Sequence, residues 1–266
     1  MKQSPILSVQ NLRVAFTSNT GLNEVLHGIS YDLFANEILG IVGESGSGKS
    51  VASLAVMGLL PPKKSVVSAG EILFKNDDLL HYTQTQLEAL RGQKIAMIFQ
   101  EPMSALNPSM RCGTQVEEIL LQHTTTTQKA AKAEVIRLFD AVKIPAPSET
   151  FEKYPHEISG GQQQRVMIAM AIACKPDILI ADEPTTALDV TVQKDIIVLL
   201  KTLQEDSKMS VIFISHDLAL VSEIADRILV MYKGNIIESG DTKSIFKTPK
   251  EDYTKALIGA RPTLNS

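Results

Sequence analysis

Short apolar runs alternate with amphipathic stretches along most of the chain. Residues 6–16 (ILSVQNLRVAF) and 29–43 (ISYDLFANEILGIVG) are rich in β-branched and aromatic residues, which predicts strands, and the second run ends in a glycine-rich loop. Residues 49–60 (KSVASLAVMGLL) are apolar on nearly every side of a helix, which predicts a helix buried in a layer that covers a sheet. Further strands are predicted at 71–75 and 94–100.

The pattern changes in the middle of the chain and then returns. From about 113 to 156, helical stretches at 114–122 and 128–144 and a turn signal at 145–149 (PAPSE) predict a helical subdomain. Beyond it, strand patterns alternate with helical ones, as in a mostly parallel sheet of the α/β class. The predicted strands are 177–182 (DILIAD), 210–215 (SVIFIS) and 227–238, and the predicted helices lie near 190–206 and 217–225.

Composition narrows the function classes. The 266 residues are 44% hydrophobic and 21% charged with a net charge of −4, and they carry no dense Lys/Arg stripe, which disfavours a nucleic-acid partner. Apolar runs such as 167–174 (MIAMAIAC) fall far short of the ~20 residues that span a bilayer, so we expect a cytoplasmic chain that meets a membrane only through a partner. Cys112 and Cys174 lack CxxC spacing and are interpreted as small hydrophobic residues.

The strongest local motif is GESGSGKS, which fits G-x-x-x-x-G-K-[ST] between a predicted strand and a predicted helix. Small residues let backbone N–H groups turn inward around phosphate oxygens, and the helix N-terminus adds partial positive charge. Lys49 supplies a point charge, and the Ser50 hydroxyl can bind Mg²⁺. The motif predicts a nucleoside triphosphate site formed by Gly43, Glu44, Ser45, Gly46, Ser47, Gly48, Lys49 and Ser50.

Polar residues also end three other predicted strands. Asp182 and Glu183 follow an apolar strand, where a parallel sheet places its ligands, so Asp182 can hold Mg²⁺ and Glu183 can take a proton from water. Gln100 and His216 end two further strands, which predicts a reaction centre at one edge of the sheet. Taken singly, the carboxylates could instead be caps before a turn at Pro184, and a lone Gln or His is more often structural.

The segment EISGGQQQR at 157–165 has no catalytic acid or base of obvious use. Ser159 and Gln162 fit a capping box, so a helix is predicted to follow, with Gly160 and Gly161 at its start. The segment is either a well-capped helix or an anion site. Because the phosphate loop already serves one nucleotide, a second anion site suggests that another copy of the protein covers its ATP.

These motifs, together with TALD at 186–189, stand in the order typical of ATP-binding cassette (ABC) ATPases over about residues 10–240, and the chain resembles that family. The resemblance implies a head-to-tail dimer in which Ser159 and Gly161 of one copy, within the segment 159–162, face the γ-phosphate bound by Lys49 of the other. Asp189 would couple the two sites, and Phe16 would stack on adenine.

The resemblance also implies the architecture and the roles of the residues. One nucleotide-binding domain would span 1–266, with a P-loop NTPase (RecA-like) core and an antiparallel β subdomain in 1–100 and 175–240, a helical signature subdomain in 101–174 and a helical tail in 241–266. ATP and Mg²⁺ are the implied cofactors. Catalysis would fall to Glu183, His216, Gln100 and Lys49, and the metal to Ser50, Gln100 and Asp182.

Longer stretches, such as QEPMSALNP at 100–108, resemble the ATPase subunits of oligopeptide and dipeptide importers, a group that includes nickel and glutathione systems. This implies a peripheral subunit on the cytoplasmic face of the inner membrane. Its partners would be a second identical or homologous ATPase, two permease subunits and, indirectly, an extracytoplasmic solute-binding protein. A permease coupling helix would dock near residues 100–108.

Three alternative functions remain, which are a soluble ATPase clamp, an exporter cassette and an importer of nickel or glutathione. A soluble ATPase clamp for DNA repair or the ribosome would carry a long inserted coiled coil, or two cassettes with a basic linker, and neither is present. An exporter cassette would not normally carry QEPMSALNP.

Members with one cassette usually continue beyond the PTL at 262–264, so the chain is half of a two-cassette protein, a trimmed chain or a short member.

Overall fold

The computed structural model describes residues 4–18, 21–100, 105–186 and 188–259. It divides into two compact units, here called unit 1 (Met1–Leu87 with Ser210–Ser266) and unit 2 (Glu88–Met209). The short helix α2 (Gln84–Leu90) runs across the division in the sequence. The subdomain boundaries expected from the sequence stay predictions.

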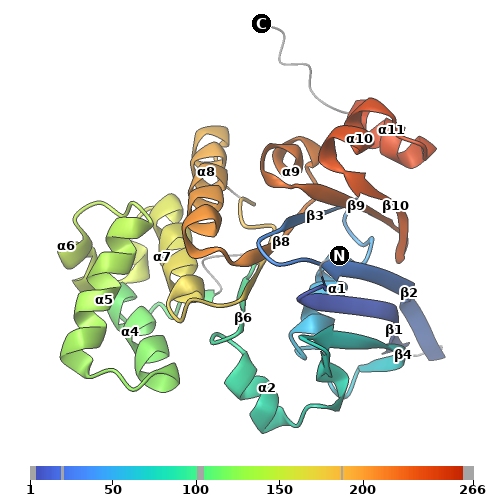
Figure 1. Cartoon of the computed structure of the whole chain (residues 1–266). Coiled ribbons are helices and arrows are strands. Elements are labelled where there is room, and N and C mark those ends of the chain that lie inside the picture. The colour runs from blue at the N-terminus through green and yellow to red at the C-terminus, as the bar shows by residue number, and fades with distance from the viewer. Residues whose placement is uncertain (1–3, 19–20, 101–104, 187, 260–266) are drawn as a thin grey trace, which may run out of the picture. The chain divides into compact units, whose positions relative to one another are not determined.

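Unit 1 contains an antiparallel sheet in the order β2-β1-β4-β5 (Figure 1). β1 pairs with β2 on one side and with β4 on the other, so that Val9 lies opposite both Tyr31 and Ile72. Leu7, Val9, Leu12 and Val14 of β1 are buried, with a register shift between Val9 and Leu12, as expected for a strand with one face against a core. The strands are β1 (Leu7–Ser18), β2 (Gly21–Leu33), β4 (Ser65–Phe74) and β5 (Asp77–Asp78), followed by a 3-10 turn at Leu79–His81.

Unit 1 also contains four strands of a second sheet, in the order β10-β9-β3-β8. β3 is parallel to both β8 and β9, while β9 and β10 form an antiparallel hairpin. All residues of β3 and β8 are buried, which explains their unbroken apolar runs. The strands are β3 (Ile38–Val42), β8 (Ser210–Ser215), β9 (Arg227–Tyr232) and β10 (Asn235–Asp241), with helices α1 (Lys49–Val56), α9 (Leu218–Ile224), α10 (Thr242–Lys247) and α11 (Asp252–Gly259).

Unit 2 combines a pair of parallel strands with a group of helices. The predicted helices at 114–122 and 128–144 are confirmed, although the second ends at Ala141, and Val116, Val135 and Phe139 are fully buried within this group. The predicted turn at 145–149 is only partly correct, because Pro147 begins a helix, a position where its missing N–H costs nothing. The elements are β6 (Ile95–Ile98), β7 (Ile178–Asp182), α4 (Cys112–His123), α5 (Gln128–Ala141), α6 (Pro147–Glu152), a 3-10 turn at Pro155–Glu157, α7 (Gly160–Ile172) and α8 (Val190–Ser207).

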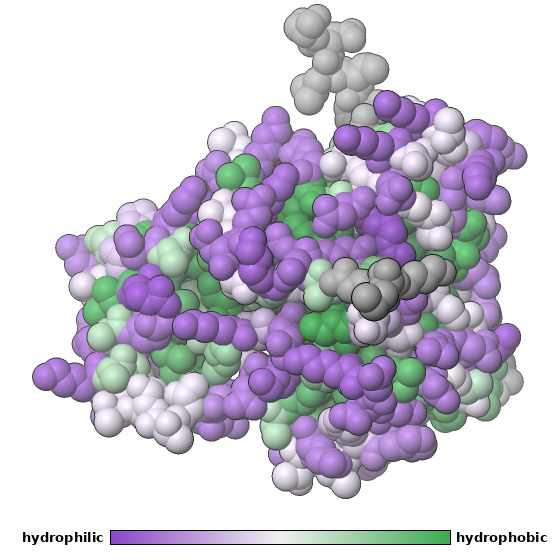
Figure 2. All heavy atoms as spheres, in the orientation of Figure 1, coloured by the Kyte–Doolittle hydropathy of each residue, from purple (hydrophilic) through white to green (hydrophobic). Residues whose placement is uncertain are grey.

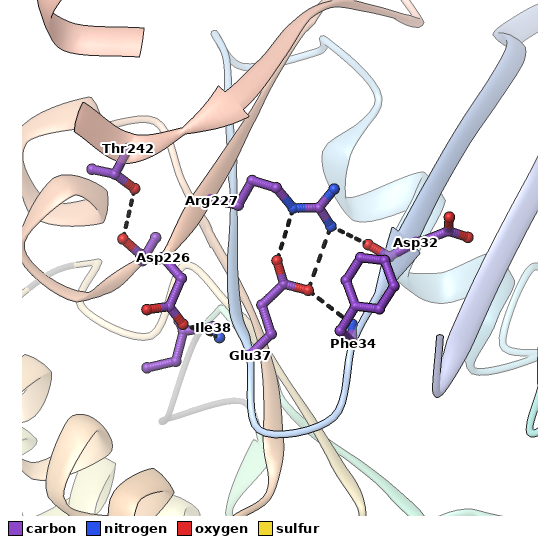
Figure 3. A network of polar contacts seen from close by, with 8 residues as sticks. Asp32, Phe34, Glu37, Ile38, Asp226, Arg227 and Thr242 are labelled. Atoms are coloured by element: carbon purple, nitrogen blue, oxygen red, sulfur yellow. Dashed lines mark hydrogen bonds and ion pairs between the residues drawn. The ribbon is translucent and has the colours of Figure 1, made fainter. Parts of the chain in front are cut away.

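A polar network in unit 1 joins β2, β3 and β9 (Figure 3). The Arg227 guanidinium donates from Nε to Glu37 Oε1 at 2.8 Å and from Nη2 to the carbonyl oxygen of Asp32. Its centre also lies 5.3 Å from the centre of the Phe34 ring. The Glu37 side chain is only 11% exposed and that of Arg227 27%. Because both charges are largely removed from water, each needs the other to offset its lost hydration.

We expect Arg227→Ala to lower the free energy of unfolding of unit 1 by about 2 kcal/mol, because it leaves a largely buried carboxylate without its cation. Denaturant unfolding of the full chain measures the change. Arg137→Ala is the matched control, since the Arg137–Glu134 pair is 60% and 32% exposed and its loss should cost within about 0.5 kcal/mol. Equal losses in the two variants would contradict this role of the network.

Candidate functional site

The phosphate loop, Gly43 to Ser50, connects β3 to α1 in unit 1. Gly43 directly follows the last residue of β3, and Gly48 forms the N-cap of α1 with a φ of 105°. Lys49, the first residue of α1, is only 5% exposed, and its Nζ donates to the carbonyl oxygens of Gly43 at 2.7 Å and Glu44 at 3.0 Å. The ammonium group therefore lies over the loop, where it can meet a phosphate.

The loop is tightly held by its own backbone and by the β9–β10 turn. Ser47 N donates to Glu44 O at 3.1 Å, and Gly234 N donates to Ser47 O at 3.0 Å. A Cβ on Gly43 would lie 2.2 Å from the carbonyl oxygen of Met231, so only glycine fits there. The buried Ser47 hydroxyl has no hydrogen-bond partner among the described residues. The loop amides, the Lys49 ammonium and the Ser47 hydroxyl together provide hydrogen-bond donors that fit a triphosphate.

His216 lies at the same end of the sheet as this loop. It directly follows Ser215, the last residue of β8, and Ser215 pairs with Val42 at the end of the parallel strand β3. The loop and His216 therefore leave neighbouring strands of unit 1 at matching positions, and His216 is exposed there.

In unit 2 the structure brings Gln100 and Glu183 into contact. β6 and β7 are parallel with Ile98 opposite Ala181, so Gln100 and the two acids leave the sheet at one edge. Gln100 Nε2 donates to Glu183 Oε2 at 3.2 Å, and Thr186 Oγ1 donates to the same oxygen at 2.9 Å. Asp182, the last residue of β7, is only 4% exposed.

Glu183 also has an uncommon backbone conformation. Its φ of 48° lies in the left-handed region, which costs a residue other than glycine of order 1–3 kcal/mol. The conformation is held by Thr186, whose N–H donates to Glu183 O at 3.2 Å while its hydroxyl holds the carboxylate. Such strained residues cluster at functional sites, which favours a catalytic role for Glu183 over a purely structural role as a cap.

The predicted capping box at the start of α7 is confirmed. Ser159 is the N-cap, Gln162 N donates to Ser159 Oγ at 3.3 Å, and Ser159 N donates to Gln162 Oε1 at 2.9 Å. Among the described residues, a Cβ on Gly160 would meet only a Leu188 methyl carbon at 4.0 Å, so their packing does not require glycine there. Ser159 and Gly160 are exposed.

The two remaining candidates, Asp189 and Phe16, lie at a helix N-cap and in a strand. Asp189 is the N-cap of α8, and its Oδ1 accepts a hydrogen bond from Val192 N at 3.0 Å. Phe16 is half-buried in β1, opposite Asn23 and Ser65. The roles expected for these two residues, coupling of the two sites by Asp189 and adenine stacking by Phe16, stay predictions. Residues 101–104, half of the segment 101–108, and Ala187 within TALD lie outside the described residues.

Sequence reasoning did not identify two contacts of this site. Thr186 supports Glu183 as described above, and its i+3 spacing from Glu183 was the available signal. Tyr253 accepts a hydrogen bond from Glu44 N in the phosphate loop at 3.0 Å. No local pattern could signal the second contact, because the two residues are 209 positions apart.

Comparison with known proteins gives consistent results. The family model described as ABC transporter matches residues 26–186. The dipeptide transport ATP-binding protein DppD of Bacillus subtilis strain 168 is 51% identical over 98% of this chain and 78% of its own length. The oligopeptide transport ATP-binding protein OppD of the same strain is 46% identical over 98% of this chain and 73% of its own.

A solved structure has a similar fold over most of the chain. The dimeric structure of a post-hydrolysis state of the ATP-binding cassette MJ0796, bound to ADP and Pi, superposes with a TM-score of 0.79 at 26% sequence identity. The match covers 89% of this chain and 98% of that one. The predicted α/β fold with a P-loop NTPase core is thereby confirmed.

Proposed function

Because this chain belongs to the ABC transporter family, we propose that it is the ATP-hydrolysing subunit of an importer for dipeptides or oligopeptides. The chain is an ABC ATPase, and such domains bind nucleotide. The observation that carries the choice of peptides is the 51% identity to a dipeptide transport ATP-binding protein over nearly the whole chain.

The phosphate loop would bind the β- and γ-phosphates of ATP, with Lys49 as the cation nearest to them. Glu183 would accept the proton of the attacking water, and Gln100 and Thr186 already hold its carboxylate in place. His216 would hydrogen-bond the γ-phosphate and keep the water in line. Phe16 would stack on the adenine ring.

The residues also fit a magnesium ion. Ser50 follows Lys49 at the start of α1, and Asp182 ends β7 with its carboxylate buried. Hydroxyl, amide and carboxylate oxygens are the ligands that Mg²⁺ prefers, so Ser50, Gln100 and Asp182 would hold it. The ion, when bound, neutralises charge on the phosphates.

A second cassette would complete the site. The exposed N-terminus of α7 has a glycine at 160 that packing among the described residues does not require, which supports close approach by a phosphate from outside the chain. Ser159, Gly160, Gly161 and Gln162 of one copy would thus cover ATP bound by the other, and Asp189 would link the two sites. The dimeric state of the similar cassette supports this arrangement.

The permease would form the membrane-spanning part of the importer. No helix in the described part of this chain is long and apolar enough to cross a membrane. On the face shown in Figure 2, hydrophilic residues cover most of the surface and hydrophobic ones show in smaller areas between them. We propose that the chain works at the cytoplasmic face of the membrane, bound to two permease subunits that receive the solute from a binding protein.

Uptake by cells tests the choice of solute. Deleting the gene should abolish uptake of a radiolabelled dipeptide or oligopeptide, and wild-type protein but not the Glu183→Gln variant should restore it, because import requires hydrolysis. Nickel and glutathione uptake, measured in the same cells, serve as controls. Peptide uptake that persists while nickel or glutathione uptake is lost would contradict the peptide assignment and favour one of those solutes.

A further inference from the structure

The C-terminal helix of unit 1 contacts the phosphate loop directly. Tyr253, in the first turn of α11, accepts a hydrogen bond at its hydroxyl oxygen from Glu44 N, with a nitrogen–oxygen distance of 3.0 Å. Glu44 is the second residue of the loop, and its side chain is exposed. The proposed function assigns no role to Tyr253.

Two sets of contacts fix the position of Tyr253. Its ring packs on the ring of Tyr232 at the end of β9, with a centroid distance of 4.4 Å and an angle of 39° between the planes. At the start of α11, the Glu238 carboxylate of β10 accepts hydrogen bonds from Lys250 N at 2.8 Å and Glu251 N at 3.1 Å. Thr254, the next residue of the helix, is fully buried. The hydroxyl of Tyr253 is therefore presented to the loop by a well-anchored helix.

The loop is thus tied at two points to the C-terminal part of unit 1. Tyr253 holds Glu44 near the beginning of the loop, and the N–H of Gly234 holds Ser47 in its middle. Burial raises the pKa of the Tyr253 hydroxyl, so it stays protonated and neutral near pH 7. A neutral hydroxyl accepts a backbone N–H without adding negative charge beside the phosphates.

We propose that Tyr253 is a positioning residue for ATP binding, acting through the backbone of Glu44 to keep the phosphate loop in its binding conformation. The inference rests on the proposed role of Gly43–Ser50 as the ATP phosphate loop. A loop that is already ordered loses less conformational entropy when the ligand binds, so a tie of this kind raises affinity without touching the ligand.

Tyr253→Phe tests the proposal, because it removes the hydroxyl and keeps the ring. Losing one hydrogen bond should weaken binding of ATP about fivefold. The same factor should appear in KM for ATP, while kcat at saturating ATP stays within about twofold, since the reacting groups are unchanged. Equilibrium titration of the full chain with a fluorescent trinitrophenyl analogue of ATP, together with steady-state hydrolysis, measures both quantities.

Tyr232→Phe is the matched control. It removes a hydroxyl from the other ring of the same stacked pair, and the Tyr232 hydroxyl makes no hydrogen bond to any residue that the structure describes. We expect wild-type affinity from this variant. If Tyr253→Phe also binds with wild-type affinity, or if the two variants weaken binding equally, the inference is wrong.

The outcomes separate this inference from the proposed function. If the wild-type chain binds the analogue and Lys49→Ala does not, the phosphate loop works as proposed, and the comparison of Tyr253→Phe with Tyr232→Phe decides the inference alone. If the wild-type chain does not bind the analogue, the proposed function and the inference both fail.

Discussion

Glu183→Gln should slow ATP hydrolysis by about 10²–10⁴-fold while ATP binding stays at the wild-type level, which is the effect expected from loss of a general base. The substitution keeps the shape of the side chain. Its amide oxygen can still accept the hydrogen bonds from Gln100 and Thr186 that now reach Glu183 Oε2. What it loses is the ability to take a proton from water, so the rate should fall without a loss of fold or of substrate binding.

Single-turnover hydrolysis and nucleotide titration of the purified chain measure the two effects separately. Glu205→Gln, an exposed glutamate on α8, is the control for the same change of charge in unit 2. Normal turnover by the Glu183→Gln variant would remove Glu183 from the role of base. A parallel loss of binding would mean that its carboxylate instead supports the nucleotide or the metal.

Lys49→Ala is expected to weaken ATP binding by about 100-fold or more, because the variant lacks the cation that would donate charge-assisted hydrogen bonds to the phosphates. The Lys49 ammonium now donates to the carbonyl oxygens of Gly43 and Glu44, which places it over the loop. A phosphate can offer it stronger acceptors than carbonyl groups. The loss should therefore appear in the dissociation constant for ATP.

Isothermal titration with ATP measures this constant. Lys63→Ala is the matched control, since Lys63 is an exposed lysine of the same unit. Thermal unfolding of both variants shows whether the fold of unit 1 is intact. If a folded Lys49→Ala variant binds ATP as the control does, Gly43–Ser50 is not the phosphate site.

Elements with a strong local pattern could be predicted from the sequence. The runs at 177–182 and 210–215 have apolar centres, ILIA and VIFI, because both faces of these strands are buried, and the structure places β7 and β8 there. The capping box of Ser159 and Gln162 was readable because both of its bonds join residues three positions apart. The run at 29–43 was less clear. It contains two strands, β2 and β3, because Asn36 adopts a left-handed φ of 63° and turns the chain.

The site itself was predictable where strand ends carry polar residues. The carboxyl ends of parallel strands share an edge, and that rule places Gln100 beside Glu183 in unit 2 and His216 with the phosphate loop in unit 1. The strained backbone of Glu183 and the hydrogen bond from Glu44 to Tyr253 could not be read from the sequence. Both depend on tertiary contacts, and no local spacing encodes them.

We propose that two copies of the chain enclose ATP between the phosphate loop of one and residues 159–162 of the other. The most direct test is the mass of the Glu183→Gln variant in solution, measured by light scattering after gel filtration with and without MgATP. The variant should shift from monomer to dimer when MgATP is added, because it binds ATP but hydrolyses it slowly.

Adding Ser159→Arg should block the shift without weakening ATP binding. Adding Ser207→Arg, about 22 Å along α8 from Val192, the residue nearest Gly161, should not block it. If the mass remains that of a monomer with ATP bound, or if the dimer still forms with Ser159→Arg, the proposed dimer around ATP is wrong.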